Sequence, residues 1–266
     1  MKDKLIVTDL DGTLLNATHE VSDFNYYWIK KFQENNGLFT FATGRMNESV
    51  MQFITLLHID FPVITYNGAQ IYCPRENKVI YNKRLTTSEE FIDFMQESMS
   101  FAEIAVFYNE QVFTLNKGRL VQEMEQKERI QTQPITIKQI PKEVTKIIFM
   151  SNDTSKLTII EQGVSKQFSN SEFIYSEPNY LEILPKETSK GNALKEIKRR
   201  YPLQDLYTVS FGNNLNDISL LDEADIGIAV KNSNPELFNI ADHVSNYTNN
   251  ESIVGNYILE LFQATK

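Results

Sequence analysis

The stretch Leu5-Ile6-Val7-Thr8-Asp9-Leu10-Asp11-Gly12-Thr13-Leu14-Leu15 decides the fold of this 266-residue chain. Residues 5–8 form an apolar or β-branched run that ends at a carboxylate. A run of this kind, bounded by a turn signal, is typical of a buried strand in a parallel sheet. Ligands bind beyond the carboxyl ends of the strands in such sheets. We therefore expect Asp9 and Asp11 to lie where a substrate arrives.

Asp9 and Asp11 are two positions apart, and an extended backbone directs such residues to the same face. Two carboxylates in one small volume repel each other, so the arrangement needs a cation between them or a proton on one of them. The alternative interpretation is a loop without chemistry, since Asp and Gly are common turn formers.

Composition and charge exclude several classes of function. The hydrophobic share of 41% and the net charge of -9 are those of a globular protein that does not bind nucleic acid, because phosphate-backbone binding needs clustered Lys and Arg. The single cysteine, Cys73, excludes an intramolecular disulfide and fits a reducing compartment. The first apolar run is too short for a signal peptide or a membrane span. We expect a cytoplasmic protein with no membrane partner.

Apolar strands that end in small polar residues recur along the chain and alternate with helical patterns. Further strands are expected at residues 38–42, 62–66, 207–211 and 226–230, and helices at 23–35, 48–57, 190–200, 215–221, 234–241 and 251–262. This alternation indicates an α/β fold, a doubly wound, Rossmann-like parallel sheet covered by helices.

A different pattern interrupts this alternation. Paired strands with fewer helices occupy residues 83–185, and the alternating pattern resumes after Pro185. Such a pattern is typical of an α+β module. We therefore predict a core made of residues 1–82 and 186–266, with residues 83–185 as an inserted α+β domain.

Four stretches resemble the motifs of the haloacid dehalogenase-like hydrolases, in the order of that family. Asp9-Leu10-Asp11-Gly12-Thr13 resembles the first motif and Thr43-Gly44-Arg45 the second. Lys190, in Thr188-Ser189-Lys190-Gly191, resembles the lysine of the third, and Gly212-Asn213-Asn214-Leu215-Asn216-Asp217 resembles the fourth. The phrases Ile64-Thr65-Tyr66-Asn67-Gly68-Ala69 and Leu181-Glu182-Ile183-Leu184-Pro185 resemble the Cof-type phosphatase subgroup. The size and position of the insertion resemble the cap of that subgroup, which implies that residues 83–185 are a cap domain that moves over the active site.

The resemblance implies a phosphatase that works through an aspartyl phosphate. Asp9 is the implied nucleophile, and Asp11 is the implied general acid and base. Thr43, Lys190 and Asn216 are implied to hold the phosphate oxygens. The implied catalytic residues are Asp9, Asp11, Thr43 and Lys190. The implied substrate-binding residues are Thr43, Gly44, Arg45, Asn67, Gly68, Lys190 and Asn216.

The resemblance also implies a Mg²⁺ site made of Asp9, Asp11, Asn213 and Asp217, with Asp11 contributing its backbone carbonyl. Asn213 departs from the pattern, because the family has an aspartate there. An amide supplies an oxygen ligand but no charge, so we expect weaker Mg²⁺ binding than in the family.

The leading hypothesis is a cytoplasmic, Mg²⁺-dependent phosphatase that acts on small phosphorylated metabolites, with sugar phosphates as the first guess. The alternatives are a phosphomutase and a phosphate-binding pseudoenzyme whose metal site is weakened by Asn213. The three histidines, His19, His58 and His243, share no spacing, and we expect ordinary surface or core positions for them.

Overall fold

The computed structural model describes residues 1–167, 171–201 and 206–264. Contacts divide the chain into two compact units. The first unit consists of Met1–Gly44, Met51–Ile80 and Ser189–Lys266, and the second of Arg45–Val50 and Tyr81–Thr188. The interpretation of these units as a catalytic core and its cap stays a prediction.

A five-stranded parallel sheet forms the centre of the first unit. Its strands, in spatial order, are β16 (His243–Val244), β15 (Ile226–Ala229), β14 (Tyr207–Gly212), β1 (Lys4–Thr8) and β2 (Leu38–Phe41). Every neighbouring pair in this sheet is parallel. The central strand β1 is buried along Leu5, Ile6 and Val7, as its apolar run requires. The predicted Rossmann-like sheet is confirmed.

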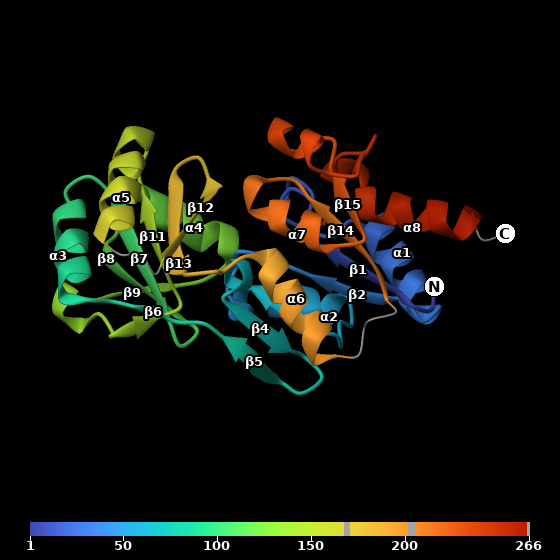
Figure 1. Ribbon diagram of the computed structural model, residues 1–266, viewed down its shortest axis with the longest axis horizontal. Coiled ribbons are helices and arrows are strands. Elements are labelled where there is room, and N and C mark those ends of the chain that lie inside the picture. Colours follow the sequence, from blue (N-terminus) through green and yellow to red (C-terminus); the bar gives the residue numbers. More distant parts are fainter. Residues whose placement is uncertain (168–170, 202–205, 265–266) are drawn as a thin grey trace. The chain divides into compact units, whose positions relative to one another are not determined.

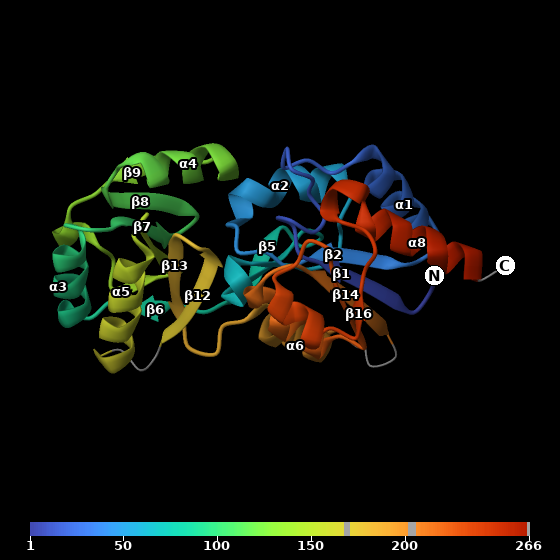
Figure 2. The same cartoon turned by 90° about the horizontal axis from the view of Figure 1, so that it is seen from above.

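Helices cover both faces of this sheet. They are α1 (Asp23–Glu34), α6 (Lys190–Arg200), α7 (Ile218–Glu223) and α8 (Ile253–Ala264). Helix α2 (Asn47–Leu56) is divided between the two units. Helices α1 and α8 pack against each other, and α6 packs against α7. Figure 2 shows α1 and α8 on one side of the sheet and α6 on the other. Ligands of such sheets bind beyond the carboxyl ends of the strands, here those of β1, β2 and β14.

The predicted strand at residues 62–66 differs from expectation. β3 (Val63–Thr65) pairs antiparallel with β4 (Gln70–Cys73), and both belong to a three-stranded sheet with β5 (Lys78–Asn82). A single parallel bridge, between Ala42 and Ile64, joins β3 to the end of β2. The reason is local: β3 has three residues, and the turn η1 (Tyr66–Gly68) reverses the chain directly after it.

Two predicted helices are also shorter than expected. The predicted helix at 215–221 begins with a 3₁₀ turn, η3 (Leu215–Asp217), and α7 starts only at Ile218. The predicted helix at 234–241 contains only the 3₁₀ turn η4 (Pro235–Asn239). Asparagine side chains cap both turns: Asn214 accepts from the N–H of Leu215, and Asn234 accepts from the N–H of Glu236. These local bonds compete with a regular helix.

The second unit contains a six-stranded sheet in the order β12-β13-β11-β7-β8-β9. Its strands are β7 (Glu103–Tyr108), β8 (Gln111–Asn116), β9 (Thr132–Pro134), β11 (Lys146–Met150), β12 (Ser171–Glu177) and β13 (Tyr180–Pro185). β6 (Leu85–Thr86) and β10 (Glu143–Val144) form a separate pair. The helices are α3 (Glu89–Ser98), α4 (Arg119–Glu128) and α5 (Thr154–Gln167). Side chains of α3 and α5 share one apolar cluster with β7, β11 and β13, and Figure 1 shows both helices beside the sheet. These strands and separate helices form the α+β arrangement that the sequence predicts for residues 83–185.

A buried ion pair joins two strands of this sheet. Lys146 on β11 donates to Glu182 on β13, with 3.2 Å between Nζ and Oε2. Their side chains are only 1% and 4% exposed. The ammonium also lies 4.6 Å from the centre of the Phe107 ring. Each charge is out of water and therefore depends on its partner.

Among the helices of the described ranges, none has the length and apolar character that crossing a membrane requires.

Candidate active site

Asp9 directly follows β1, where the sheet fixes its backbone. Its N–H donates to the carbonyl of Phe211 at the end of β14, at 2.9 Å. The chain then turns, with the N–H of Thr13 donating to the carbonyl of Leu10. Gly12 has a φ of +76°, and a Cβ there would lie 2.4 Å from the side-chain nitrogen of Asn213. The positive φ favours glycine at this position, and a Cβ would also displace the side chain of Asn213.

Lys190 is the first residue of α6 and connects two carboxylates. Its Nζ donates to Oδ1 of Asp9 and to Oδ1 of Asp217, each at 2.6 Å. The side chains of Lys190 and Asp217 are fully buried, and that of Asp9 is 8% exposed. The helix begins where Ser189 accepts from the N–H of Asn192. A lysine in the first turn opposes the helix dipole, and here the two carboxylates compensate it.

Close backbone contacts fix the position of Lys190. A Cβ at Gly191 would lie 2.0 Å from the carbonyl oxygen of Ser219, so α6 and the start of α7 touch through their backbones. A Cβ at Gly68 would lie 2.1 Å from the carbonyl oxygen of Ser189. The start of α6 is therefore held from two sides by glycine contacts that no other residue permits.

Burial and charge shift the pKa values of this group. Burial raises the pKa of Asp9 to about 7; the neighbouring Asp217 and Asp11 charges act in the same direction, and Lys190 opposes them. Burial alone would lower the pKa of Lys190, but Asp217 and Asp9 outweigh it, so the pKa lies above its usual range. Lys190 thus remains an ammonium at every physiological pH.

Both carboxylate oxygens of Asp217 have partners in the structure. Oδ1 accepts from Lys190, and Oδ2 accepts from the backbone N–H groups of Asn213 and Asn214, at 2.9 and 3.0 Å. These bonds hold the loop after β14 against α6. They favour an orienting role for Asp217, and its predicted role as a metal ligand stays a prediction.

Asn213 lies beside the turn that follows Asp9. Its Oδ1 accepts from the hydroxyl of Thr13 at 3.1 Å, which directs the amide oxygen toward the first motif. Within the part of the chain that the structure describes, no three or more His, Cys, Asp or Glu side chains are grouped to hold a metal. The oxygen donors that remain are the carboxylate of Asp9, the backbone carbonyl of Asp11 and the amide of Asn213. This set fits a hard cation that keeps waters and binds phosphate.

The end of β2 and the turn after β3 come together beside the fourth motif. The N–H of Thr43 donates to the carbonyl of Ile64, and the N–H of Asn67 donates to the carbonyl of Thr43, both at 2.9 Å. Asn216 donates from Nδ2 to Oδ1 of Asn67 at 2.9 Å. Four predicted substrate-binding residues are thereby brought together: Thr43, Gly44, Asn67 and Asn216.

Left-handed backbone marks the same turn. Tyr66, Asn67 and Gly68 have φ values of +51°, +53° and +101°. Tyr66 and Asn67 are fully buried. A bulky residue with positive φ is strained, and such strain persists only where the surroundings hold it. Arg45 follows Gly44 in the chain but is grouped with the second unit, and its part in substrate binding stays a prediction.

His19 is partly exposed, in agreement with the expected surface position, but it contacts a residue of the first motif. His19 Nδ1 lies 3.2 Å from Oδ1 of Asp11 and forms an ion pair or hydrogen bond with it. The spacing of the three histidines carried no sign of this contact. The signal that could have revealed it is the turn sequence Asn16-Ala17-Thr18-His19, which brings the chain back toward Asp11.

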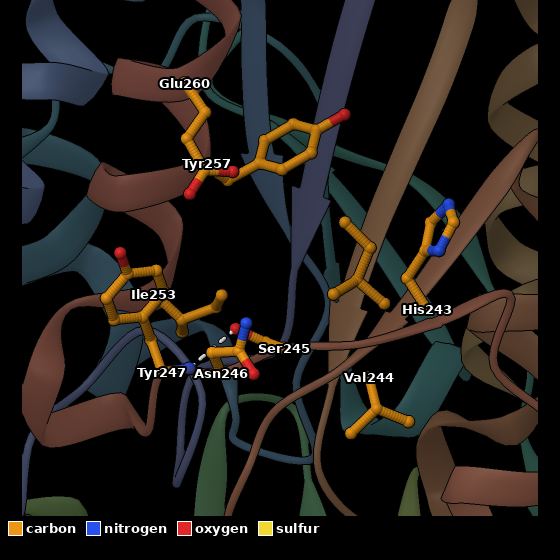
Figure 3. A pocket seen from close by; sticks show the side chains of 9 residues that line it. His243, Val244, Ser245, Asn246, Tyr247, Ile253, Tyr257 and Glu260 are labelled. Carbon is orange, nitrogen blue, oxygen red and sulfur yellow. Dashed lines mark hydrogen bonds between the residues drawn. The ribbon is translucent and has the colours of Figure 1, made fainter.

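A pocket at the edge of the first unit takes no part in this site. Figure 3 shows Tyr257 and Glu260 of α8 on one side of it and His243 and Val244 of β16 on the other. None of the residues that line it belongs to the four motifs.

The end of the central strand thus carries carboxylates with a buried ammonium between them. Residues 6–258 match the family model described as haloacid dehalogenase-like hydrolase, and the chain belongs to that family. The predicted resemblance is confirmed, and the protein is a phosphatase. Hydrolases of this family generally use a divalent metal ion.

Relatives resemble this chain along almost its whole length. It is 25% identical over 287 residues to phosphatase YwpJ of Bacillus subtilis, covering 97% of this chain and 99% of the relative. The crystal structure of TM0651 from Thermotoga maritima is 26% identical, with a TM-score of 0.81 over 98% of this chain and 97% of that one. A haloacid dehalogenase-like hydrolase from B. subtilis is 25% identical, with a TM-score of 0.85 over 97% and 99%.

Proposed function

We propose that the protein is a cytoplasmic, Mg²⁺-dependent phosphatase that hydrolyses monoesters of small phosphorylated metabolites through an aspartyl phosphate. The observation that carries the proposal is the buried ammonium of Lys190 between Asp9 and Asp217. A structural cross-link would need only one carboxylate. Two carboxylates around one ammonium keep a net negative charge at the end of the central strand, which suits a site that is completed by a divalent cation and a phosphate.

In the first step, a carboxylate oxygen of Asp9 bonds to phosphorus while the bond from phosphorus to the ester oxygen breaks. Lys190 orients Asp9 by holding its Oδ1. Asp11 transfers its proton to the departing ester oxygen, so that an alcohol leaves instead of an alkoxide. This step divides a difficult hydrolysis into two easier displacements.

In the second step, Asp11 takes a proton from water, whose oxygen bonds to phosphorus. The bond from phosphorus to Asp9 breaks, which restores the carboxylate and releases inorganic phosphate. The N–H of Gly44, the Thr43 hydroxyl and the Asn216 amide would bind the phosphate oxygens.

A divalent cation would be held by Asp9, the backbone carbonyl of Asp11 and Asn213, where it would offset the negative charge of carboxylate and phosphate. This role agrees with the pKa of Asp9, which is raised to about 7 without a cation. A nearby positive charge favours the ionised carboxylate that the first step requires.

Sugar phosphates are the first substrate class to test. A solved structure that shares this fold at 20% identity is described as a sugar phosphatase of subclass IIB. The insertion that makes up most of the second unit is the part of the chain most suited to select among such esters.

The test is hydrolysis of an aryl phosphate and of a panel of phosphorylated metabolites, with Mg²⁺ and with excess chelator. We expect turnover that chelator removes, sugar phosphates among the highest kcat/KM values, and no turnover by Asp9→Asn. A protein that binds inorganic phosphate but hydrolyses no ester in Mg²⁺ would be the pseudoenzyme instead.

A further inference from the structure

His19 sits on a short hairpin that follows the first motif. The N–H of Asn16 donates to the carbonyl of Glu20, and the N–H of His19 donates to the carbonyl of Asn16, both at 2.9 Å. The side chain of Asn16 accepts from the N–H groups of Thr18 and Glu20, each at 3.0 Å. His19 itself has a φ of +57°. The tip of this hairpin therefore has a defined conformation, with histidine at a left-handed position that few residues other than glycine adopt and that histidine tolerates better than most.

Asparagine side chains fix the hairpin and the preceding turn to other loops of the first unit. The N–H of Ala17 donates to Oδ1 of Asn250 at 2.8 Å. Nδ2 of Asn249 donates to the carbonyl of Leu15 at 2.8 Å, and Nδ2 of Asn232 donates to the carbonyl of Gly12 at 3.1 Å. The N–H of Asn249 also donates to Oδ1 of Asn232 at 3.0 Å. The segment from Gly12 to His19 is thus tied down near both of its ends.

The contact that this hairpin makes is with the carboxylate of Asp11. His19 Nδ1 lies 3.2 Å from Asp11 Oδ1, and the two side chains are 43% and 28% exposed. Pairs of surface charges at this exposure contribute little to stability. The stability gained from this bond therefore does not explain why histidine occupies a position with positive φ. A role of His19 at the active site explains it better.

We propose that His19 is a positioning residue for Asp11, a role that rests on the proposed function. By bonding Oδ1, His19 restricts rotation of the carboxyl group about its side-chain torsions. Asp11 must face the ester oxygen at the moment when the bond to phosphorus breaks, and a small misplacement of a proton donor costs much of its effect. His19 does not itself touch phosphate in this assignment.

The test compares two esters, because only one of them needs the proton. An alkyl phosphate releases a strongly basic oxygen and depends on Asp11, whereas the weakly basic oxygen of p-nitrophenyl phosphate hardly does. The readout is kcat/KM, which reports the steps through transfer of the phosphoryl group to Asp9. The alkyl ester is the best one found in the metabolite screen.

Three variants separate positioning from folding. His19→Ala removes the bond, and His19→Asn restores a nitrogen on Cγ, where Nδ1 stands in histidine, with a residue that tolerates positive φ. His243→Ala, at an exposed histidine on β16, is the matched control. Thermal unfolding of each variant shows whether the fold is retained.

We expect His19→Ala to lose about tenfold in kcat/KM toward the alkyl phosphate and less than roughly twofold toward p-nitrophenyl phosphate. His19→Asn should restore most of the alkyl activity, and His243→Ala should match the wild type with both esters. Equal losses with both esters, no loss with either, or no rescue by asparagine would overturn the inference. A wild-type protein without turnover is a different result, which removes the proposed function and this role together.

Discussion

Replacing Asp9 by asparagine should stabilise the protein when no divalent metal is present, and the gain should grow with pH. Asp9 is a buried carboxylate whose pKa is raised to about 7 from an ordinary value of 3.8, by burial first and then by the Asp217 and Asp11 charges. The folded state therefore disfavours the ionised form, although Lys190 offsets part of the effect. Asparagine has similar size and carries no charge.

The sign follows from the two pKa values. Below pH 3.8 the carboxyl group is protonated in the folded and unfolded states alike, so it carries no penalty. Between pH 3.8 and about 7 the unfolded chain loses its proton first, and the free energy of unfolding falls as the pH rises. Above about pH 7 the penalty is complete. A shift of about three pKa units corresponds to on the order of 4 kcal/mol.

We expect a net gain of about 2–4 kcal/mol for Asp9→Asn at pH 8, since local relaxation reduces the full electrostatic amount. For a chain of this size the gain corresponds to a rise in Tm of several degrees. At pH 5 the gain should be clearly smaller.

The assay is thermal unfolding in chelator at pH 5 and pH 8, with Asp222→Asn as a control. Asp222 is an exposed aspartate on α7, so this variant makes the same charge change away from the site. Adding Mg²⁺ should stabilise the wild type more than Asp9→Asn, because a bound cation offsets the charge of Asp9. A gain that is equal at both pH values, or a loss at pH 8, would refute the reasoning.

Three further results are expected. Asp11→Asn should lower kcat/KM toward an alkyl phosphate about 10²–10⁴-fold and affect p-nitrophenyl phosphate much less; an unchanged alkyl rate would remove Asp11 as the acid. Asn213→Asp should lower the Mg²⁺ concentration for half-maximal activity about tenfold, or roughly 1.4 kcal/mol, with kcat little changed; an identical Mg²⁺ titration would mean that Asn213 is no ligand. Lys146→Met should cost about 3–5 kcal/mol in urea unfolding, because the buried carboxylate of Glu182 loses the ammonium of Lys146. The double variant Lys146→Met/Glu182→Leu should recover most of that loss, and a double variant as unstable as the single one would contradict the pairing.

The sequence alone was sufficient to predict the parallel sheet and the strand ends that carry polar residues. A continuous apolar run such as residues 5–8 has few alternatives to a buried parallel strand, and the turn residues after it are visible in the chain. A lysine at a helix start opposes the helix dipole, so the position of Lys190 also indicated an anionic partner. The sequence did not show which carboxylates pair with Lys190, because only the tertiary fold brings Asp9 and Asp217 close to it.

Other features depended on geometry that local patterns do not encode. The sequence predicted β3 as another parallel strand, but the positive φ of Tyr66 turns the chain back so that β4 pairs antiparallel with β3. Tyrosine is not a residue type that indicates a positive φ. The contact between His19 and Asp11 needs a hairpin whose tip depends on the Asn16 side chain. The bonds to both oxygens of Asp217 depend on the loop after β14.

The central position of β1 has a consequence for how the chain reaches its native state during synthesis. β1 lies between β2 and β14, so one of its two edges finds a partner only when the last third of the chain has been made. Lys190 follows Asp9 by 181 residues, and at typical rates of synthesis this separation amounts to about 10–40 s. The insertion therefore emerges and can fold while the edge of β1 that pairs with β14 is still unpaired. The ion cluster that orients the nucleophile must be among the last parts of the molecule to form.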